Sequence, residues 1–283
     1  MESKDQKDSY FLIDSGSGYK LEQFGPYIIS RPCSQAVWLP QLSQEKWNQA
    51  HASFSREGQN KWTKREKLPE EWFVRLSNVK FKISPTDFGH LGVFPEQKNF
   101  WSWIQKVVSK GKRVLNLFAY SGGVTLAAAK GGAEVCHLDA SKGMVAWARE
   151  NAALNHLEQA PIRWIIDDVS KFLVRELRRG SKYDAIILDP PSFGRGSKGE
   201  VFKIEDEIIP LLRSCRDLLT DHPLFILFSC HTPGFSPLVM EHLLKQTLKD
   251  ISGKIDSGEM VLEGTSGIFS VPSGTFARWQ YAP

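Results

Sequence analysis

The sequence predicts an α/β fold with a mostly parallel sheet, preceded by a small β-rich domain. Three observations lead to this prediction. From residue 97 onward, apolar strands alternate with amphipathic helices, which is typical of parallel sheets covered by helices on both faces. The last two predicted strands follow one another without a helix, which indicates an antiparallel edge strand. Before residue 97 the chain is rich in aromatic residues, proline and short alternating runs.

The amino-terminal part is predicted to form short strands. Alternating runs cover residues 10–14, 27–30 and 79–83, with turn residues at 15–18 and 84–87. Residues 44–55 are expected to form a short helix between them. We therefore expect an accessory, substrate-recognition domain over residues 1–80 and a larger α/β domain over residues 81–283.

The larger domain follows a regular alternation. Strands are expected over residues 113–118, 134–139, 162–166, 183–188, 224–229, 259–262 and 275–279. Helices are expected over residues 99–109, 124–130, 141–155, 169–179, 208–219 and 237–250. Ser141 is a suitable N-cap, and Met144, Trp147, Ala148 and Asn151 recur after it at helical spacing.

Composition excludes several classes of protein. The chain has 283 residues, 41% of them hydrophobic and 24% charged, which excludes collagen-like, fibrous and disordered proteins. The net charge of +4 permits contact with nucleic acid without requiring it. Basic residues gather around Trp62, at Arg56, Lys61, Lys64, Arg65 and Lys67. This cluster is either a phosphate-binding surface with Trp62 stacked on a base, or a solvated loop whose charge Glu57 and Glu66 dilute.

The polar amino terminus contains no apolar core of the signal-peptide type. The apolar runs are also far shorter than the ~20 residues that a membrane-spanning helix needs. We therefore predict a cytoplasmic protein with no membrane partner. The four cysteines, Cys33, Cys136, Cys215 and Cys230, lack CxxC spacing. The absence of CxxC pairs argues against a zinc site and against a disulfide framework, so we expect no bound metal.

Ligands of open α/β sheets bind beyond the carboxyl ends of the strands. The first strand of the larger domain is followed by Phe118-Ala119-Tyr120-Ser121-Gly122, which leads directly into a helix. Small residues there let the backbone approach a ligand, and helix amides can face it. A GxGxxG fingerprint is missing, which disfavours a nicotinamide-dependent dehydrogenase.

Carboxylates follow the next two strands. Asp139 ends the second strand, where a carboxylate is suited to bind ribose hydroxyls. The alternative role, capping the next helix, is already served by Ser141. Asp168 follows the third strand and is suited either to an adenine amino group or to an N-cap.

The fourth strand ends in Asp189-Pro190-Pro191-Ser192-Phe193. Two prolines cannot continue a central strand, so they impose an abrupt and rigid exit from the sheet. This exit fixes the Asp189 carboxylate and the Phe193 ring at the open end of the sheet. A carboxylate beside an aromatic ring suits a flipped nucleobase, which needs edge hydrogen bonds and stacking.

Together these segments resemble class I S-adenosylmethionine-dependent methyltransferases, and among them the large-subunit ribosomal RNA group with cytosine-C5 and guanine-N7 enzymes. The resemblance covers about residues 80–280 and rests on the segments 89–97, 116–122, 137–141, 147–151, Asp168 and 189–193. An uncharacterised bacterial branch is more similar still, through residues 193–196, 199–201, 257–259 and 276–279. The RNA-binding PUA domain of several members has no evident counterpart here.

The resemblance implies a Rossmann-like methyltransferase sheet, S-adenosylmethionine as cofactor, and RNA, foremost ribosomal RNA, as substrate. The cofactor-binding residues it implies are Gln97, Phe118, Ala119, Tyr120, Ser121, Gly122, Asp139, Ala140, Ser141, Asp168 and Asp189. It places Tyr120–Gly122 at the methionine part, Asp139 at the ribose and Asp168 at the adenine. Asp189 belongs to the substrate side, with Pro190, Pro191, Phe193 and Cys230 as further catalytic candidates.

Cys230 ends the fifth strand. In cytosine-C5 enzymes of this group, a cysteine there attacks C6 of the base, which requires a thiolate. Neighbouring strand residues point to opposite faces, so His231 is not an obvious base for this cysteine. C5 methylation through Cys230 is the first hypothesis. Methylation of a base or protein nitrogen, oriented by Asp189 and the Pro191 carbonyl, and a non-catalytic cofactor-binding module are the alternatives.

Overall fold

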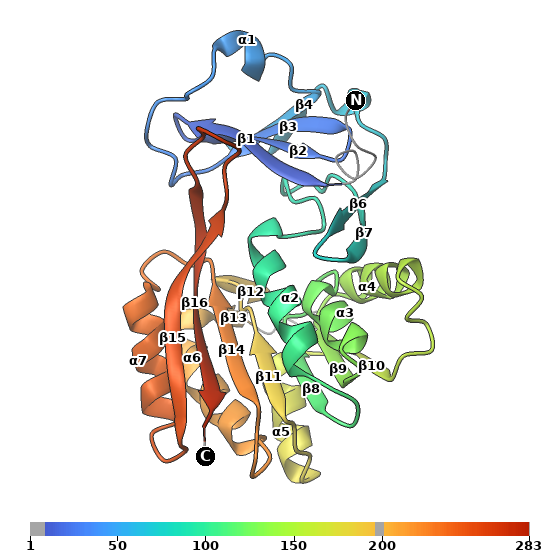
Figure 1. Cartoon of the computed structure of the whole chain (residues 1–283), viewed down its shortest axis with the longest axis vertical. Helices are drawn as coiled ribbons and strands as arrows, with labels where there is room; N and C mark the ends of the chain where they lie inside the picture. The colour runs from blue at the N-terminus through green and yellow to red at the C-terminus, as the bar shows by residue number, and fades with distance from the viewer. Residues whose placement is uncertain (1–8, 196–200, 283) are drawn as a thin grey trace. The chain divides into compact units, whose positions relative to one another are not determined.

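The structure is a computed structural model that describes residues 9–195 and 201–282, and its chain forms two compact units (Figure 1). Unit 1 comprises residues 1–98 and 261–273, and unit 2 comprises residues 99–260 and 274–283. Strands β15 (Gly253–Leu262) and β16 (Val271–Tyr281) contribute to both units. The chain thus passes between the units three times, and the domain boundary at residue 80 stays a prediction.

Unit 1 contains a five-stranded sheet in the order β1-β2-β3-β4-β5. Its strands are β1 (Tyr10–Gly16), β2 (Tyr19–Phe24), β3 (Tyr27–Pro32), β4 (Ala52–Ser55) and β5 (Lys61–Thr63). Only the β3–β4 pair is parallel. A separate hairpin joins β6 (Trp72–Leu76) to β7 (Val79–Ile83), and the 3-10 helices η1 (Arg65–Lys67) and η2 (Pro95–Gln97) complete the unit.

The helix predicted over residues 44–55 is wrong for most of its length. Only α1 (Gln44–Trp47) is helical, and β4 follows it. Ala52 and Phe54 are buried while their neighbours are less so, which is the period of a strand, and Ala52 pairs with Ile29 of β3. Sheet pairing over this distance overrides the local helical preference.

The tryptophans of unit 1 pack inside it. Trp72 donates a hydrogen bond to the Phe24 carbonyl (3.0 Å). Trp62 is half-buried, packs against the Phe54 ring at 5.1 Å and donates to the Thr86 carbonyl (2.8 Å). These contacts give the Trp62 ring a structural role, and its stacking on a base stays a prediction.

Unit 2 contains a seven-stranded sheet in the order β10-β9-β8-β11-β14-β16-β15 (Figure 1). The strands β8 (Arg113–Leu117), β9 (Glu134–Asp139), β10 (Ile162–Ile166), β11 (Ala185–Leu188) and β14 (Phe225–Cys230) are mutually parallel. β16 is antiparallel to β14. The predicted mostly parallel sheet with an antiparallel addition at one edge is therefore confirmed.

Helices cover both faces of this sheet. The side chains of α5 (Val169–Arg178), α6 (Ile204–Asp217) and α7 (Pro237–Thr247) form one core with Leu117, Leu188 and Phe228 of the central strands. The other helices are α2 (Lys98–Val107), α3 (Gly123–Lys130) and α4 (Lys142–Leu154). Their side of the sheet holds a Trp103–Phe225 ring contact and an Asn116–Thr125 hydrogen bond. Within the described residues, no helix has both the length and the apolar character needed to cross a membrane.

Candidate active site

The order of the strands places two of the predicted motifs side by side. β8 is hydrogen-bonded to β9 on one side and to β11 on the other, so the chain direction across the sheet reverses between β8 and β11. Leu117 pairs with Leu188, the last residue of β11. The segment after β8 and Asp189 after β11 therefore lie at the switch point where α/β sheets bind ligands.

The segment after β8 has an unusual backbone. Phe118 and Tyr120 have φ values of 55° and 50°, and Gly122 has a φ of 93°. Non-glycine residues with positive φ are uncommon, and they concentrate at functional sites. A Cβ on Gly122 would lie 3.1 Å from the Ala148 Cβ of α4. The turn is therefore closely packed against α4, where a side chain at position 122 would be strained.

Asp139 holds this turn in place. Its two carboxylate oxygens accept hydrogen bonds from the backbone N–H groups of Tyr120 (2.9 Å) and Ser141 (2.8 Å). A carboxylate can accept about four hydrogen bonds, so two acceptor positions are left for ligand hydroxyls. Burial raises the pKa of Asp139, and the two backbone donors oppose this rise. Ser141 caps α4 by accepting from the Met144 N–H, as predicted.

A buried polar row lies behind the turn. Asn116 donates to the Thr125 hydroxyl (2.9 Å), which is 2.8 Å from Nδ1 of His137. The Thr125 hydroxyl therefore bridges the Asn116 amide and the His137 ring. Burial lowers the pKa of His137 to about 3. Asn151 of α4 donates to the Ser121 carbonyl (2.9 Å), so helices and strands fix the turn from both sides.

Asp168 is an N-cap. Its carboxylate accepts from the Lys171 N–H (3.0 Å) at the start of α5. The adjacent Asp167 forms an ion pair with Arg175. The capping role that the sequence left open for Asp168 is present, and its role at an adenine stays a prediction.

The exits of β11 and β14 are linked to each other. Asp189 Oδ1 lies 3.5 Å from His231 Nδ1. The Ser192 and Thr232 hydroxyls form a 2.7 Å hydrogen bond. Pro190 is buried between the two linked positions, whereas Pro191 is exposed. The Asp-Pro-Pro corner is thus fixed against the end of β14.

An aromatic hairpin continues from this corner. Phe193 begins β12 (Phe193–Arg195) and is half exposed, and β12 pairs with β13 (Val201–Lys203). The Phe202 ring of β13 lies 5.2 Å from the ring of Phe118 after β8. Residues Gly196, Gly199 and Glu200, which carried part of the resemblance, lie outside the described residues.

Cys230 is a buried thiol. It is 1% exposed, and its sulfur accepts from the Thr232 N–H (3.3 Å). Burial raises the pKa of Cys230, the hydrogen bonds with Thr232 lower it in part, and the nearby Asp189 carboxylate adds to the rise. The net rise disfavours the thiolate that covalent catalysis requires.

His231 was not expected as a base for Cys230 and Thr232 was not predicted at all, but the structure brings both to the corner at Asp189. Within a strand, the side chains of neighbouring residues point to opposite faces of the sheet. Because β14 ends at Cys230, this rule does not determine where the His231 side chain points. Its position directly after a strand end was the signal that could have found it. Gln97 is buried in η2 of unit 1, and its role toward the cofactor stays a prediction.

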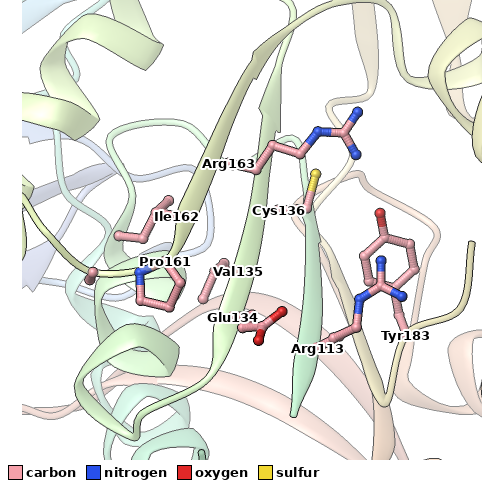
Figure 2. A pocket seen from close by; sticks show the side chains of 9 residues that line it. Arg113, Glu134, Val135, Cys136, Pro161, Ile162, Arg163 and Tyr183 are labelled. Atoms are coloured by element: carbon pink, nitrogen blue, oxygen red, sulfur yellow. The ribbon is translucent and has the colours of Figure 1, made fainter. Parts of the chain in front are cut away.

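A pocket of about 370 Å³ lies at the amino ends of β8, β9 and β10 (Figure 2). Asp139, Asp189 and the Phe118–Gly122 turn lie at the opposite, carboxyl ends of the strands. Arg113 lies over the Tyr183 ring at 5.1 Å. Arg163 is 3.2 Å from Glu176, which also accepts from the Tyr183 hydroxyl (2.7 Å). Against the effect of burial, hydrogen bonds from Tyr183, Ser181 and Arg179, together with the charge of Arg163, lower the pKa of Glu176 to about 2. Arg113 and Arg163 therefore both take part in contacts that stabilise the amino ends of these strands.

Comparison with known proteins decides the family. The profile of the S-adenosylmethionine-dependent methyltransferase family matches residues 33–252. The chain belongs to this family. The strand-end geometry fits its cofactor, because Asp139 retains acceptor capacity for ribose hydroxyls beside the Phe118–Gly122 turn. When bound, S-adenosylmethionine supplies an electrophilic methyl group on a sulfonium sulfur.

Relatives of this methyltransferase are named for ribosomal RNA or share its fold. It is 33% identical over 58% of its length to the ribosomal RNA large subunit methyltransferase K/L of Syntrophotalea carbinolica, covering 23% of that protein. It is 33% identical over 71% of its length to the ribosomal RNA large subunit methyltransferase I of Aeromonas salmonicida, covering 50% of that protein. The chain thus spans half or less of these two curated relatives. The SAM-dependent methyltransferase of Agrobacterium tumefaciens is 41% identical with a TM-score of 0.92, over 100% of this chain and 93% of that one.

Proposed function

We propose that this methyltransferase methylates a base in RNA, with ribosomal RNA as the first candidate. The observation that carries the proposal is the rigid corner at Asp189. Its links to the end of β14 fix it, and it lies beside the Phe118–Gly122 turn that follows β8. The two curated relatives, named as ribosomal RNA methyltransferases, support the substrate class. The cytoplasmic location expected from the sequence suits such a substrate.

The corner offers what a flipped base needs. The Asp189 carboxylate accepts hydrogen bonds from N–H groups on the edge of a base, and Phe193 offers an aromatic face next to it. The two prolines remove backbone freedom, so the carboxylate does not have to be ordered when the base arrives. Holding the base in line with the transferable methyl group is then the main catalytic contribution of these residues.

The environment of Cys230 favours transfer to a nitrogen without a covalent intermediate. A thiol that is buried and has a raised pKa is a poor nucleophile. A ring or amino nitrogen oriented by Asp189 needs no thiolate. We therefore place nitrogen methylation ahead of C5 methylation through Cys230.

We expect the Cys230→Ala variant to retain methyl transfer within about threefold, because the thiol then contributes only packing. The rate should also lack a rise through the alkaline range, which a nucleophile with a raised pKa would produce. Initial rates across pH 6–10 with radiolabelled cofactor measure both properties. Cys230→Ser is the volume-matched control. Complete loss of activity in both variants, with cofactor binding retained, would establish the covalent mechanism.

The class of molecule that receives the methyl group, RNA or protein, tests the proposed substrate class. The full chain is incubated with tritiated S-adenosylmethionine and, in parallel, with total RNA, intact ribosomes and a protein extract. We expect label in the two RNA-containing samples, sensitive to ribonuclease. Label confined to the protein extract would overturn the proposed function.

A further inference from the structure

The hairpin β6–β7 of unit 1 has two different faces. Along both strands, alternate residues are buried, ending in Trp72 and Ile83 at one end and Leu76 and Val79 at the other. The Trp72 ring fixes the buried face by its hydrogen bond to the Phe24 carbonyl and its contact with Tyr27 at 5.1 Å. Because the buried face of the hairpin is packed in this way, the other face of the hairpin points outward.

The outward face combines an aromatic ring with cations. It carries Phe73 and Arg75 from β6 and Lys80 and Lys82 from β7. Phe73 is 42% exposed, and the Lys80 ammonium lies 4.9 Å from its ring centroid. Glu71 is 3.1 Å from Lys82 and offsets one of the three positive charges. A net positive charge around an exposed ring results.

The register places like charges opposite each other. Arg75 is the direct cross-strand partner of Lys80, and like charges directly opposite each other on a sheet repel. The two-residue turn at Ser77 and Asn78 has positive φ at both positions (46° and 63°), as tight hairpins require. The like-charged pair is thus part of a rigid element.

Charge is concentrated in this part of the chain. Residues 56–82 contain eight Lys and Arg against four Glu, so this segment alone carries +4, equal to the net charge of the whole protein. Within the segment, the ring of Trp62 packs against Phe54 and Arg65 donates to two backbone carbonyls. Hairpin β6–β7 is therefore where an exposed ring and cations coincide.

We propose that the outward face of hairpin β6–β7 binds single-stranded RNA, an inference that rests on RNA being the substrate. A base stacks on Phe73, and Arg75 and Lys80 contact the phosphates beside it. Base stacking on an exposed ring combined with cations along the backbone is how proteins bind single strands without reading sequence. A polyanion also relieves the repulsion between Arg75 and Lys80.

Fluorescence anisotropy with a fluorescein-labelled oligouridylate of about 12 nucleotides tests the proposal, a length within the usual site size. We expect Phe73→Ala to weaken binding by at least about fivefold, the lower end of the effect of losing one stacked base. The matched control is Phe88→Ala, which removes a 67% exposed ring from the same unit and should bind as the wild type does. Equal losses in both variants, or none in Phe73→Ala, would overturn the stacking site.

Charge is tested separately. The double variant Arg75→Glu with Lys80→Glu should flatten the dependence of log affinity on log salt by about 0.7 for each phosphate that the hairpin no longer neutralises. Lys249→Glu with Lys254→Glu changes the net charge equally at exposed positions of unit 2 and should leave the slope unchanged. Equal binding of polyglutamate and oligouridylate by the wild type would indicate an acidic protein partner and overturn the RNA assignment.

The two proposals fail in different ways. If RNA accepts the tritiated methyl group but the hairpin variants bind oligouridylate normally, only the hairpin assignment is overturned. If label enters only protein, the RNA substrate is overturned whatever the hairpin binds. Circular dichroism melting of each variant confirms that the fold is intact before binding is compared.

Discussion

Replacement of Asp189 by Asn is expected to lower kcat for methyl transfer by about 10²–10³-fold, the usual cost of removing one preorganised electrostatic contact to the reacting group. The amide keeps the size of the side chain but loses the charge that faces the base. Single-turnover assays with labelled cofactor measure the rate. Calorimetric titration with S-adenosylmethionine should give an affinity within about twofold of the wild type, because Asp189 is predicted to act on the substrate side.

Asp206→Asn is the matched control, since Asp206 is an exposed carboxylate in the first turn of α6. It should leave both the rate and cofactor binding unchanged. If Asp189→Asn also loses cofactor affinity, the residue belongs to the cofactor site and the assignment to the substrate side is wrong.

Replacement of Asp139 by Ala is expected to weaken S-adenosylmethionine binding by about 10–100-fold, as the loss of charge-assisted hydrogen bonds predicts. The variant loses the predicted acceptor for ribose hydroxyls and leaves the Tyr120 and Ser141 N–H groups without this partner. Calorimetry measures the affinity directly. Because burial raises the pKa of Asp139, wild-type affinity should fall as the pH drops through that raised pKa, since protonation removes the charge.

Asp168→Asn provides the comparison. Asn is as good an N-cap as Asp, so α5 keeps its cap while the carboxylate at the predicted adenine position is removed. A modest loss of affinity, smaller than for Asp139→Ala, is expected. Unchanged cofactor affinity in Asp139→Ala would refute the ribose assignment and with it the placement of the cofactor along β8 and β9.

Much of unit 2 could be predicted because its signals are local. Apolar strands between amphipathic helices fixed the element types, and the two prolines after Asp189 marked the end of β11. Ser141 was correctly assigned as the cap of α4. These features depend on neighbours within a few residues, which is the range that a sequence pattern reports.

The remaining features depend on contacts between distant segments. Residues 52–55 form a strand because β3 pairs with them. The link between Asp189 and His231 depends on β11 and β14 being neighbours, and the burial of Cys230 depends on the helices packed over β14. The Cys230 hypothesis came from its position at a strand end. The thiol environment that weighs against it is visible only in the folded chain.

Nucleoside analysis of the methylated product tests most directly whether this protein methylates a base of RNA with the help of Asp189. RNA labelled by the full chain is digested to nucleosides, and mass spectrometry locates the methyl group on the base or on the ribose. We expect a base-methylated nucleoside that is formed by the wild type and by Cys230→Ala and that forms about 10²–10³-fold more slowly with Asp189→Asn. A methyl group on the ribose 2′-oxygen, or a product of equal yield with Asp189→Asn, would contradict it.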